Sequence, residues 1–106
     1  MKPIWIVDDD EEMSRAIELM LKLLECEVTK FHSVRSAAQM FASGRKPDLL
    51  LLDINMPGVS GFEILSFVRR EPRLTQVPVF ICTSDDQPQT RKRAMENGAS
   101  DFLLKP

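Results

Sequence analysis

The sequence predicts an α/β fold in which a parallel β-sheet is covered by helices. Two observations carry this prediction. Short apolar runs alternate along the chain with longer segments that have the residue spacing of amphipathic helices. The run "DLLLLD" (residues 48–53) is apolar throughout between its two acids, which is typical of a strand buried on both faces. The length of 106 residues indicates one domain.

Five short runs rich in residues that favour extended structure predict the strands. In chain order they are "PIWIV" (3–7), "EVTKF" (27–31), "DLLLLD" (48–53), "VPVFICT" (77–83) and "DFLLK" (101–105). The third run follows Pro47, and we expect its leucines to be covered on both faces of the sheet. Cys82 lies in the fourth run and is expected to be a buried small hydrophobic residue.

Four segments with helical spacing separate these strands. They are residues 13–24, 34–43, 61–71 and 87–97. The acids before the first segment suit a helix N-terminus, and Gly44 can close the second. In the third, Phe62, Leu65 and Val68 are expected to face inward, and the helix stops before Pro72. The fourth segment has only a weak apolar face.

The resulting order βαβαβαβαβ implies parallel strands joined by right-handed crossovers. Five such strands favour the flavodoxin-like, doubly wound sheet with the strand order 2-1-3-4-5. In a sheet of this kind, ligands bind at the carboxyl ends of the strands, near the switch point between strands one and three. The side chains that follow the strands are therefore the candidates for a functional site.

Polar residues follow four of the five strands: Asp8-Asp9-Asp10, Asp53, Thr83-Ser84 and Lys105. Carboxylates brought together from two strands repel each other, and a divalent cation such as Mg²⁺ would relieve that repulsion. A carboxylate can also act as a nucleophile that accepts a phosphoryl group. In such a site Lys105 would neutralise charge on the transferred group, and Thr83 would donate a hydrogen bond to it.

Net charge, the length of the apolar runs and the cysteine pattern limit the possible partners and the cellular location of the protein. The net charge of −2 gives no general attraction to nucleic acid or to a membrane surface. We expect no signal peptide and no membrane span, since no run approaches the ~20 apolar residues that one needs. Cys26 and Cys82 form no paired motif, which favours a reducing, cytoplasmic location.

Four stretches now carry a resemblance: "WIVDDDE" (5–11), "LLLLDINMPGVSGFEIL" (49–65), "PVFICTS" (78–84) and "GASDFLLKP" (98–106). Together they make the chain resemble the receiver domain of two-component response regulators over essentially all of residues 1–106. The resemblance implies that Asp53 is the phosphorylated residue and that Asp8 and Asp9 form the acidic pair. It further implies a Mg²⁺ (or Mn²⁺) site in which Asp9 and Asp53 bind the metal, Asp8 acts through water, and Asn55 supplies its backbone carbonyl.

The resemblance also assigns roles around this site. Thr83 matches the switch hydroxyl, Lys105 the lysine of the family's site, and Phe102 the switch aromatic, where many members carry Tyr or His. Because Phe has no hydroxyl, switching at Phe102 would be a change of packing. Asn55 and Asp85 match positions that tune the lifetime of the phosphoryl group. Pro57 and Gly58 are expected to set the turn before the third helix.

The implied function is phosphorelay signalling without turnover of a separate substrate. A sensor histidine kinase, a phosphotransfer protein or a small phosphodonor would phosphorylate Asp53. The surface around the fourth helix and the fifth strand would then change its preference for an effector that the sequence does not identify. The resemblance implies no nucleic-acid or membrane binding by this domain.

The chain departs from the family because it stops at Pro106, where receivers continue into a fifth helix. An uncovered parallel sheet is disfavoured. We therefore expect either a truncated chain or a second chain that fills the gap, as in a face-packed or domain-swapped dimer.

Two other functions compete with phosphoacceptor signalling. One is a receiver-like interaction module that takes no phosphate. The other is a small phosphatase of the haloacid dehalogenase type, with Asp8 as nucleophile and Asp10 as acid. Glu12 breaks the D-x-D-x-[TV] pattern of that family, and 106 residues leave little room for its cap.

Overall fold

The computed structural model describes residues 1–56 and 60–105, and five strands form its centre. They are β1 (Lys2–Val7), β2 (Cys26–Phe31), β3 (Leu49–Leu52), β4 (Val79–Thr83) and β5 (Asp101–Leu104). All neighbouring strands pair in parallel, in the order β2-β1-β3-β4-β5. The predicted flavodoxin-like, doubly wound sheet is therefore confirmed, with strand ends one or two residues from those expected.

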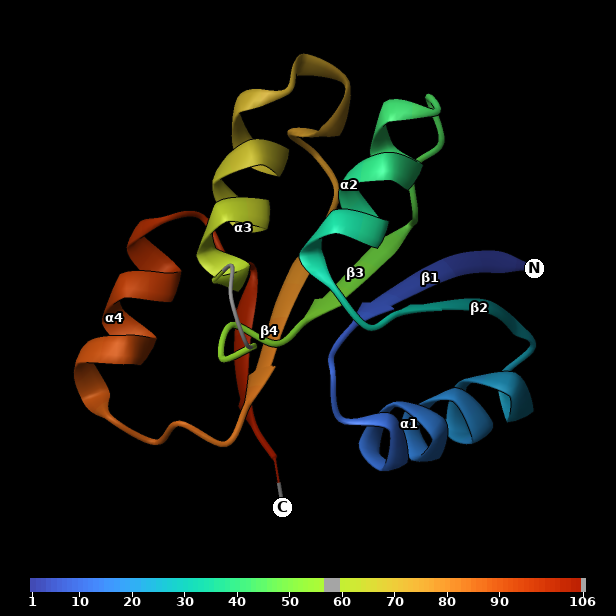
Figure 1. Ribbon diagram of the computed structural model, residues 1–106, viewed down its shortest axis with the longest axis horizontal. Coiled ribbons are helices and arrows are strands. Elements are labelled where there is room, and N and C mark those ends of the chain that lie inside the picture. The colour runs from blue at the N-terminus through green and yellow to red at the C-terminus, as the bar shows by residue number, and fades with distance from the viewer. Residues whose placement is uncertain (57–59, 106) are drawn as a thin grey trace.

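Helices fill the four connections between strands. They are α1 (Glu11–Leu23), α2 (Val34–Ala42), α3 (Gly61–Arg70) and α4 (Pro88–Glu96), with a 3₁₀ turn η1 (Pro72–Leu74) after α3. Figure 1 shows α2 and α3 side by side on one face of the sheet and α1 on the other. None of the helices in the described ranges is long and apolar enough to cross a membrane.

Side-chain caps explain where the first three helices begin. The Asp10 carboxylate accepts a hydrogen bond from the Met13 backbone N–H at 3.1 Å, so one of the three acids after β1 starts α1. Ser33 and Ser60 cap α2 and α3 in the same way. The third helix ends at Arg70 because the next residue turns to an extended conformation before Pro72.

The main core lies between the sheet and the helices α2 and α3. Leu50 and Leu52 of β3 point into it and are fully buried. Leu49 and Leu51 point to the opposite face and are only half-buried, so the prediction of burial on both faces is right for one face alone. Among the described helices, α1 is the one that covers the opposite face, and it packs against the β2 end of the sheet.

Cys82 lies on the same half-covered face of the sheet. It is half-buried, so the prediction that it is buried is wrong. Cys82 pairs in register with Leu103 of β5, which is 43% exposed. Phe62 faces inward only in part: it packs against the core but is half-buried, while Leu65 and Val68 are fully buried as expected. The Phe62 ring lies at the rim of α3, where the guanidinium carbon of Arg93 stands 3.9 Å from the ring centroid.

Candidate functional site

The backbone ladder fixes three charged residues just beyond the ends of their strands. The N–H of Asp8 donates to the carbonyl oxygen of Phe31 at 2.9 Å, and the N–H of Asp53 donates to that of Val7 at 2.9 Å. The N–H of Lys105 donates to the carbonyl oxygen of Thr83 at 2.8 Å. The parallel pairing thus continues past β1, β3 and β5 and brings these side chains to one edge of the sheet.

At that edge, one buried ammonium bridges two buried carboxylates. The Nζ of Lys105 lies 2.8 Å from Oδ2 of Asp8 and 3.0 Å from Oδ2 of Asp53. The three side chains are 8%, 4% and 6% exposed, respectively. The other oxygen of each carboxylate accepts a backbone hydrogen bond, from Asp10 at 2.9 Å and from Asn55 at 3.0 Å. The acids are therefore held rigidly, and their orientation is set by the chain itself.

Burial and mutual repulsion shape the electrostatics of this cluster. Burial raises the pKa of Asp8 above its ordinary value, and the nearby charge of Asp53 raises it further, against the opposing effect of Lys105. For Lys105, burial alone would lower the pKa of the ammonium. The hydrogen bonds to Asp8 and Asp53 outweigh burial and raise the pKa to about 12. Lys105 is thus a permanent cation at neutral pH, facing two acids.

The acidic cluster also fits a divalent metal ion. Asp8, Asp9 and Asp53 each offer one carboxylate oxygen, and these oxygens lie within 4.8 Å of one another. Asp9 is exposed and the other two are buried, so the cluster opens to solvent on one side. One ammonium for three carboxylates leaves an excess of negative charge. Hard oxygen ligands with excess negative charge are what Mg²⁺ and Mn²⁺ bind.

Thr83 lies beside this cluster at the end of β4 and is fully buried. Its hydroxyl oxygen accepts hydrogen bonds from the backbone N–H of Asp85 at 3.3 Å and from the side-chain amide of Asn55 at 3.4 Å. The Asn55 amide therefore joins the loop after β3 to the end of β4. The resemblance implied a metal-binding carbonyl and a lifetime-tuning position for Asn55, but nothing in the sequence pattern indicated this contact of its side chain with Thr83.

Asp85 turns toward the start of α4. One of its carboxylate oxygens accepts the backbone N–H of Gln87 at 3.0 Å, and the other accepts the Thr90 hydroxyl at 2.9 Å. These hydrogen bonds, with that of Gln87 the larger, lower the pKa of Asp85. Its carboxylate thus orders the loop before α4.

Phe102 is buried in the core between β5 and α4 and pairs in register with Ile81. The guanidinium carbon of Arg91, on α4, lies 5.9 Å from the centroid of its ring. The side chain is therefore a packing element on the α4 side of the sheet.

Asp10, the third acid after β1, is not free to act in the cluster, since its carboxylate caps α1.

Sequence reasoning missed Gly61, the first residue of α3. A Cβ at this position would overlap the backbone carbonyl oxygen of Asp53 and lie 2.8 Å from the Cα of Ile54. Glycine therefore lets α3 begin directly against the backbone of the acidic cluster. The only available signal was a glycine after a capping serine, which does not reveal a close approach. The expected turn at Pro57 and Gly58 lies outside the described residues.

The fold and the site define the chain as a flavodoxin-like protein whose carboxyl edge carries a buried Asp–Lys–Asp cluster. The model of the response regulator receiver domain matches residues 4–106, and the chain belongs to that family. Among curated proteins, the two-component response regulator ORR8 of Oryza sativa subsp. indica is 30% identical over 103 residues. The matched region is 97% of this chain and 85% of that protein.

Solved structures agree with this assignment. The Vibrio cholerae chemotaxis protein CheY4 is 26% identical, and its structure superposes with a TM-score of 0.88 over 100% of this chain and 88% of that one. The Mn²⁺-bound form of the response regulator Rcp1 is 24% identical, with a TM-score of 0.91 over 100% of this chain and 82% of that one. At this identity the second match shows a shared fold, and its Mn²⁺ is a property of Rcp1.

Proposed function

We propose that this domain accepts a phosphoryl group on Asp53 and thereby passes a signal through a two-component pathway. The observation that carries the proposal is the contact of Lys105 with both Asp53 and Asp8 at the carboxyl edge of the sheet. Membership of the receiver family supports it. Residues 1–106 would act as one domain whose only reactions are its own phosphorylation and dephosphorylation.

The transfer is a displacement at phosphorus. An oxygen of the Asp53 carboxylate attacks the phosphorus of the donor and forms a new P–O bond. The bond between phosphorus and the donor's nitrogen or oxygen breaks, and its electron pair leaves with the donor. Lys105 then stands beside the added negative charge and stabilises it. Thr83 is placed at the next strand end, where its hydroxyl would donate to a phosphoryl oxygen.

A divalent cation, Mg²⁺ or Mn²⁺, would be held by Asp8, Asp9 and Asp53, with the backbone carbonyl of Asn55 completing its protein ligands. When bound, it neutralises charge on the phosphoryl oxygens. The three carboxylate oxygens within 4.8 Å of one another support this site. In this arrangement Asp9 and Asp53 would contact the ion directly, and Asp8 would act at longer range, through water.

Switching would follow from a change of hydrogen-bond partner at Thr83. Its hydroxyl oxygen accepts long hydrogen bonds from Asn55 and Asp85, of 3.4 and 3.3 Å. The Thr83 O–H would donate to a phosphoryl oxygen, and this new bond would draw the hydroxyl away from those two weak donors. The core residue Phe102 would respond by repacking beneath α4, since it carries no hydroxyl to donate. Asn55 and Asp85 both donate to the Thr83 hydroxyl, and they would set how long the phosphoryl group survives.

The partners in this proposal are a sensor histidine kinase or a phosphotransfer protein as donor, and an effector whose identity the chain does not carry. Such signalling places the domain in the cytoplasm. It requires no nucleic acid or membrane. The engagement of Asp10 in the cap of α1 disfavours the phosphatase alternative, which needs that residue as an acid.

Intact-mass spectrometry tests the proposal. The protein is incubated with Mg²⁺ and a small acyl phosphate, and we expect an adduct of one phosphoryl group that is labile to base. The adduct should be lost with EDTA and in Asp53→Asn, while Asp48→Asn, an exposed acid before β3, should be phosphorylated normally. A folded protein without an adduct would leave the interaction-module function in its place.

A further inference from the structure

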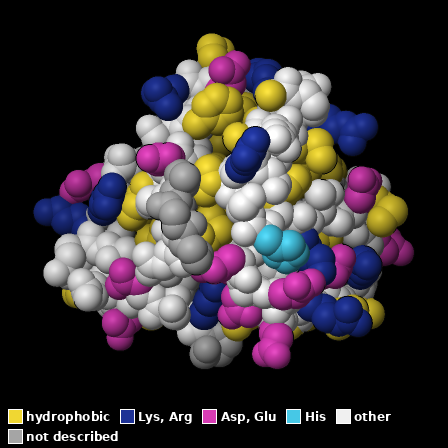
Figure 2. All heavy atoms as spheres, viewed as in Figure 1, with side chains coloured by type: hydrophobic (Ala, Val, Ile, Leu, Met, Phe, Trp, Pro, Cys, Tyr) yellow, Lys and Arg dark blue, Asp and Glu magenta, His cyan; other side chains and the backbone are white. Residues whose placement is uncertain are grey.

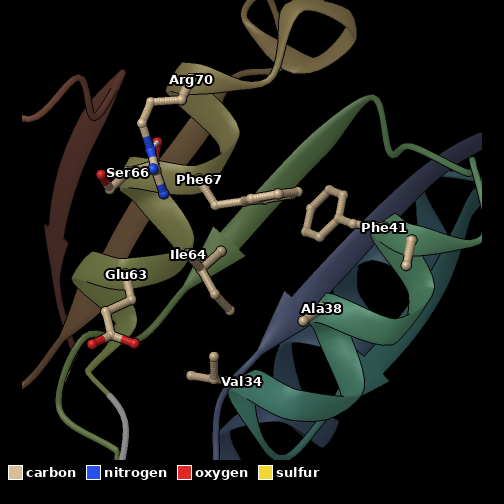
Figure 3. Close-up of a pocket in the computed structure, with 9 residues that line it drawn as sticks. Val34, Ala38, Phe41, Glu63, Ile64, Ser66, Phe67 and Arg70 are labelled. Carbon is tan, nitrogen blue, oxygen red and sulfur yellow. Dashed lines mark hydrogen bonds between the residues drawn. The ribbon is translucent and has the colours of Figure 1, made fainter.

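A solvent-open groove runs between α2 and α3, on the sheet face away from α1 and outside the acidic cluster. It has a volume of about 460 Å³. Val34, Ala38 and Phe41 of α2 form one wall, and Ile64 and Phe67 of α3 form part of the other. Figure 3 shows Phe41 and Phe67 pointing toward each other, with Ile64 below them facing α2. Figure 2 shows the hydrophobic side chains gathered between the two helices.

The groove is hollow because small residues line its α2 wall. Ala38 and Ala42 lie one helical turn apart and are both exposed, so they leave space that a larger side chain would fill. Phe67, across from them, is 37% exposed although it is aromatic. The size falls within the range of pockets that hold small organic ligands, and the apolar lining with a few polar groups is typical of such pockets.

A cationic group stands at one end of this apolar surface. The Nε of Arg70 donates to the backbone carbonyl oxygen of Ser66 at 3.2 Å, which holds the guanidinium along α3. In Figure 3 the Arg70 side chain folds back toward Ser66, so the guanidinium and the Ser66 hydroxyl lie together on the rim of the groove. Within the described residues, the terminal nitrogens of Arg70 have no hydrogen-bond partner, and they form a fork that suits a carboxylate.

Side chains of opposite charge on α3 stand near the two ends of the groove. Glu63 lines the groove near the start of α3, seven residues before Arg70, which is about 10 Å along a helix. An anionic group is therefore repelled at the Glu63 end and attracted at the Arg70 end. Ile64 and Phe67 lie between these charges and would cover the hydrocarbon part of a bound molecule.

We propose that the α2–α3 groove binds an apolar monocarboxylate, with its carboxylate on Arg70 and Ser66 and its hydrocarbon on Ala38, Ile64 and Phe67. The cationic fork of Arg70 favours this ligand over an uncharged hydrocarbon. The site is independent of the proposed phosphorylation of Asp53, because none of the lining residues belongs to the acidic cluster.

Octanoate is a suitable probe, and two-dimensional ¹H–¹⁵N NMR of the labelled protein gives both affinity and location. We expect saturable shifts confined to α2 and α3, with a dissociation constant on the order of 1 mM for a ligand of this size. Octanol, which has the same chain without the charge, should bind about 10-fold more weakly. A helical peptide segment would be the better candidate occupant if octanoate and octanol bound equally or not at all.

Two variants and one control test separately the charged and the apolar part of the proposed site. Arg70→Met keeps an apolar stem and should weaken octanoate about 10-fold while leaving octanol unchanged. Ala38→Leu fills the groove from an exposed helical position and should abolish binding of both probes without unfolding the protein. Lys22→Met removes an exposed cation on α1 and should change nothing. Unchanged octanoate binding in Arg70→Met or Ala38→Leu would overturn the proposal, as would shifts centred on the exposed leucines of α1.

Discussion

Replacing Lys105 by Met should destabilise the domain strongly at neutral pH and much less in acid. In the folded protein the Lys105 ammonium lies within 3.0 Å of two carboxylates, and its pKa is raised from 10.5 to about 12. A difference of about 1.5 units corresponds to roughly 2 kcal/mol of favourable interaction with the ammonium. This figure is a lower bound on the destabilisation by Lys105→Met, because it omits the charge compensation that Asp8 and Asp53 lose.

Without Lys105, Asp8 and Asp53 would remain buried with one backbone hydrogen bond each and no cation. Breaking a buried ion pair on one side typically costs about 3–5 kcal/mol, because a charge is left uncompensated. We therefore expect Lys105→Met to lose about 3–5 kcal/mol at pH 7. That loss is a large part of the 5–15 kcal/mol of stability that domains usually have.

The pH dependence has a definite sign. Burial already raises the pKa of Asp8 in the folded protein, and removal of the cation raises it further. A carboxyl group with a raised folded pKa favours folding when protonated. The deficit of Lys105→Met should therefore be full at pH 7 and shrink as the pH falls toward 3.8, the ordinary value of an aspartate.

Urea unfolding followed by circular dichroism at pH 7, 6 and 5 measures this deficit. Lys22→Met is the matched control, because that lysine is 58% exposed and its pair with Glu18 is on the surface. We expect the control to lie within about 0.5 kcal/mol of the wild type. The reasoning is refuted if Lys105→Met matches the wild type at pH 7, or if its deficit grows on acidification.

Three further predictions follow from the same site. Gly61→Ala should cost about 1–3 kcal/mol in urea unfolding, because its Cβ would overlap the Asp53 backbone; an unchanged midpoint would contradict the close approach. The wild type should lose about 2 kcal/mol in total as the pH rises from below 10.5 to above 12 and Lys105 deprotonates, and Lys105→Met should show no such step. Mg²⁺ should raise the melting temperature of the wild type and not of Asp9→Asn, and equal increases would place the ion elsewhere.

Much of the site could be predicted because parallel strands deliver the residues after them to one edge. Asp8, Asp53 and Lys105 follow three different strands, and the order of the sheet brings them together without any detail of side-chain packing. The sequence could not show that Lys105 bridges both acids. That contact depends on the side-chain rotamers of Lys105, Asp8 and Asp53.

The burial predictions that need correction concern side chains whose surroundings a local sequence pattern does not determine. Helical spacing placed Phe62 inward with Leu65 and Val68. Phe62 does pack against the core, but it lies at the edge of that face, is half-buried and also contacts the guanidinium of Arg93. The apolar run of β3 predicted burial on both faces, and Cys82 in β4 was expected to be buried, but burial depends on which helices cover each face of the sheet. Cys82 is therefore half-buried on the face that α1 covers only in part.

The close approach of α3 to Asp53 was also beyond the sequence. Gly61 follows the capping residue Ser60, so its local pattern is that of an ordinary helix start. Only the three-dimensional arrangement shows that the helix presses against the backbone of the acidic residue. The contact matters because any side chain at position 61 would push α3 away from the site.

The central claim is that Asp53 receives the phosphoryl group, and chemical mapping tests it most directly. Borohydride reduces an aspartyl phosphate to homoserine, which peptide sequencing by mass spectrometry locates. After treatment with a small acyl phosphate and Mg²⁺, we predict homoserine at position 53 and at no other acid. Homoserine at position 8 would contradict the claim, because Asp8 is the other buried carboxylate that contacts Lys105.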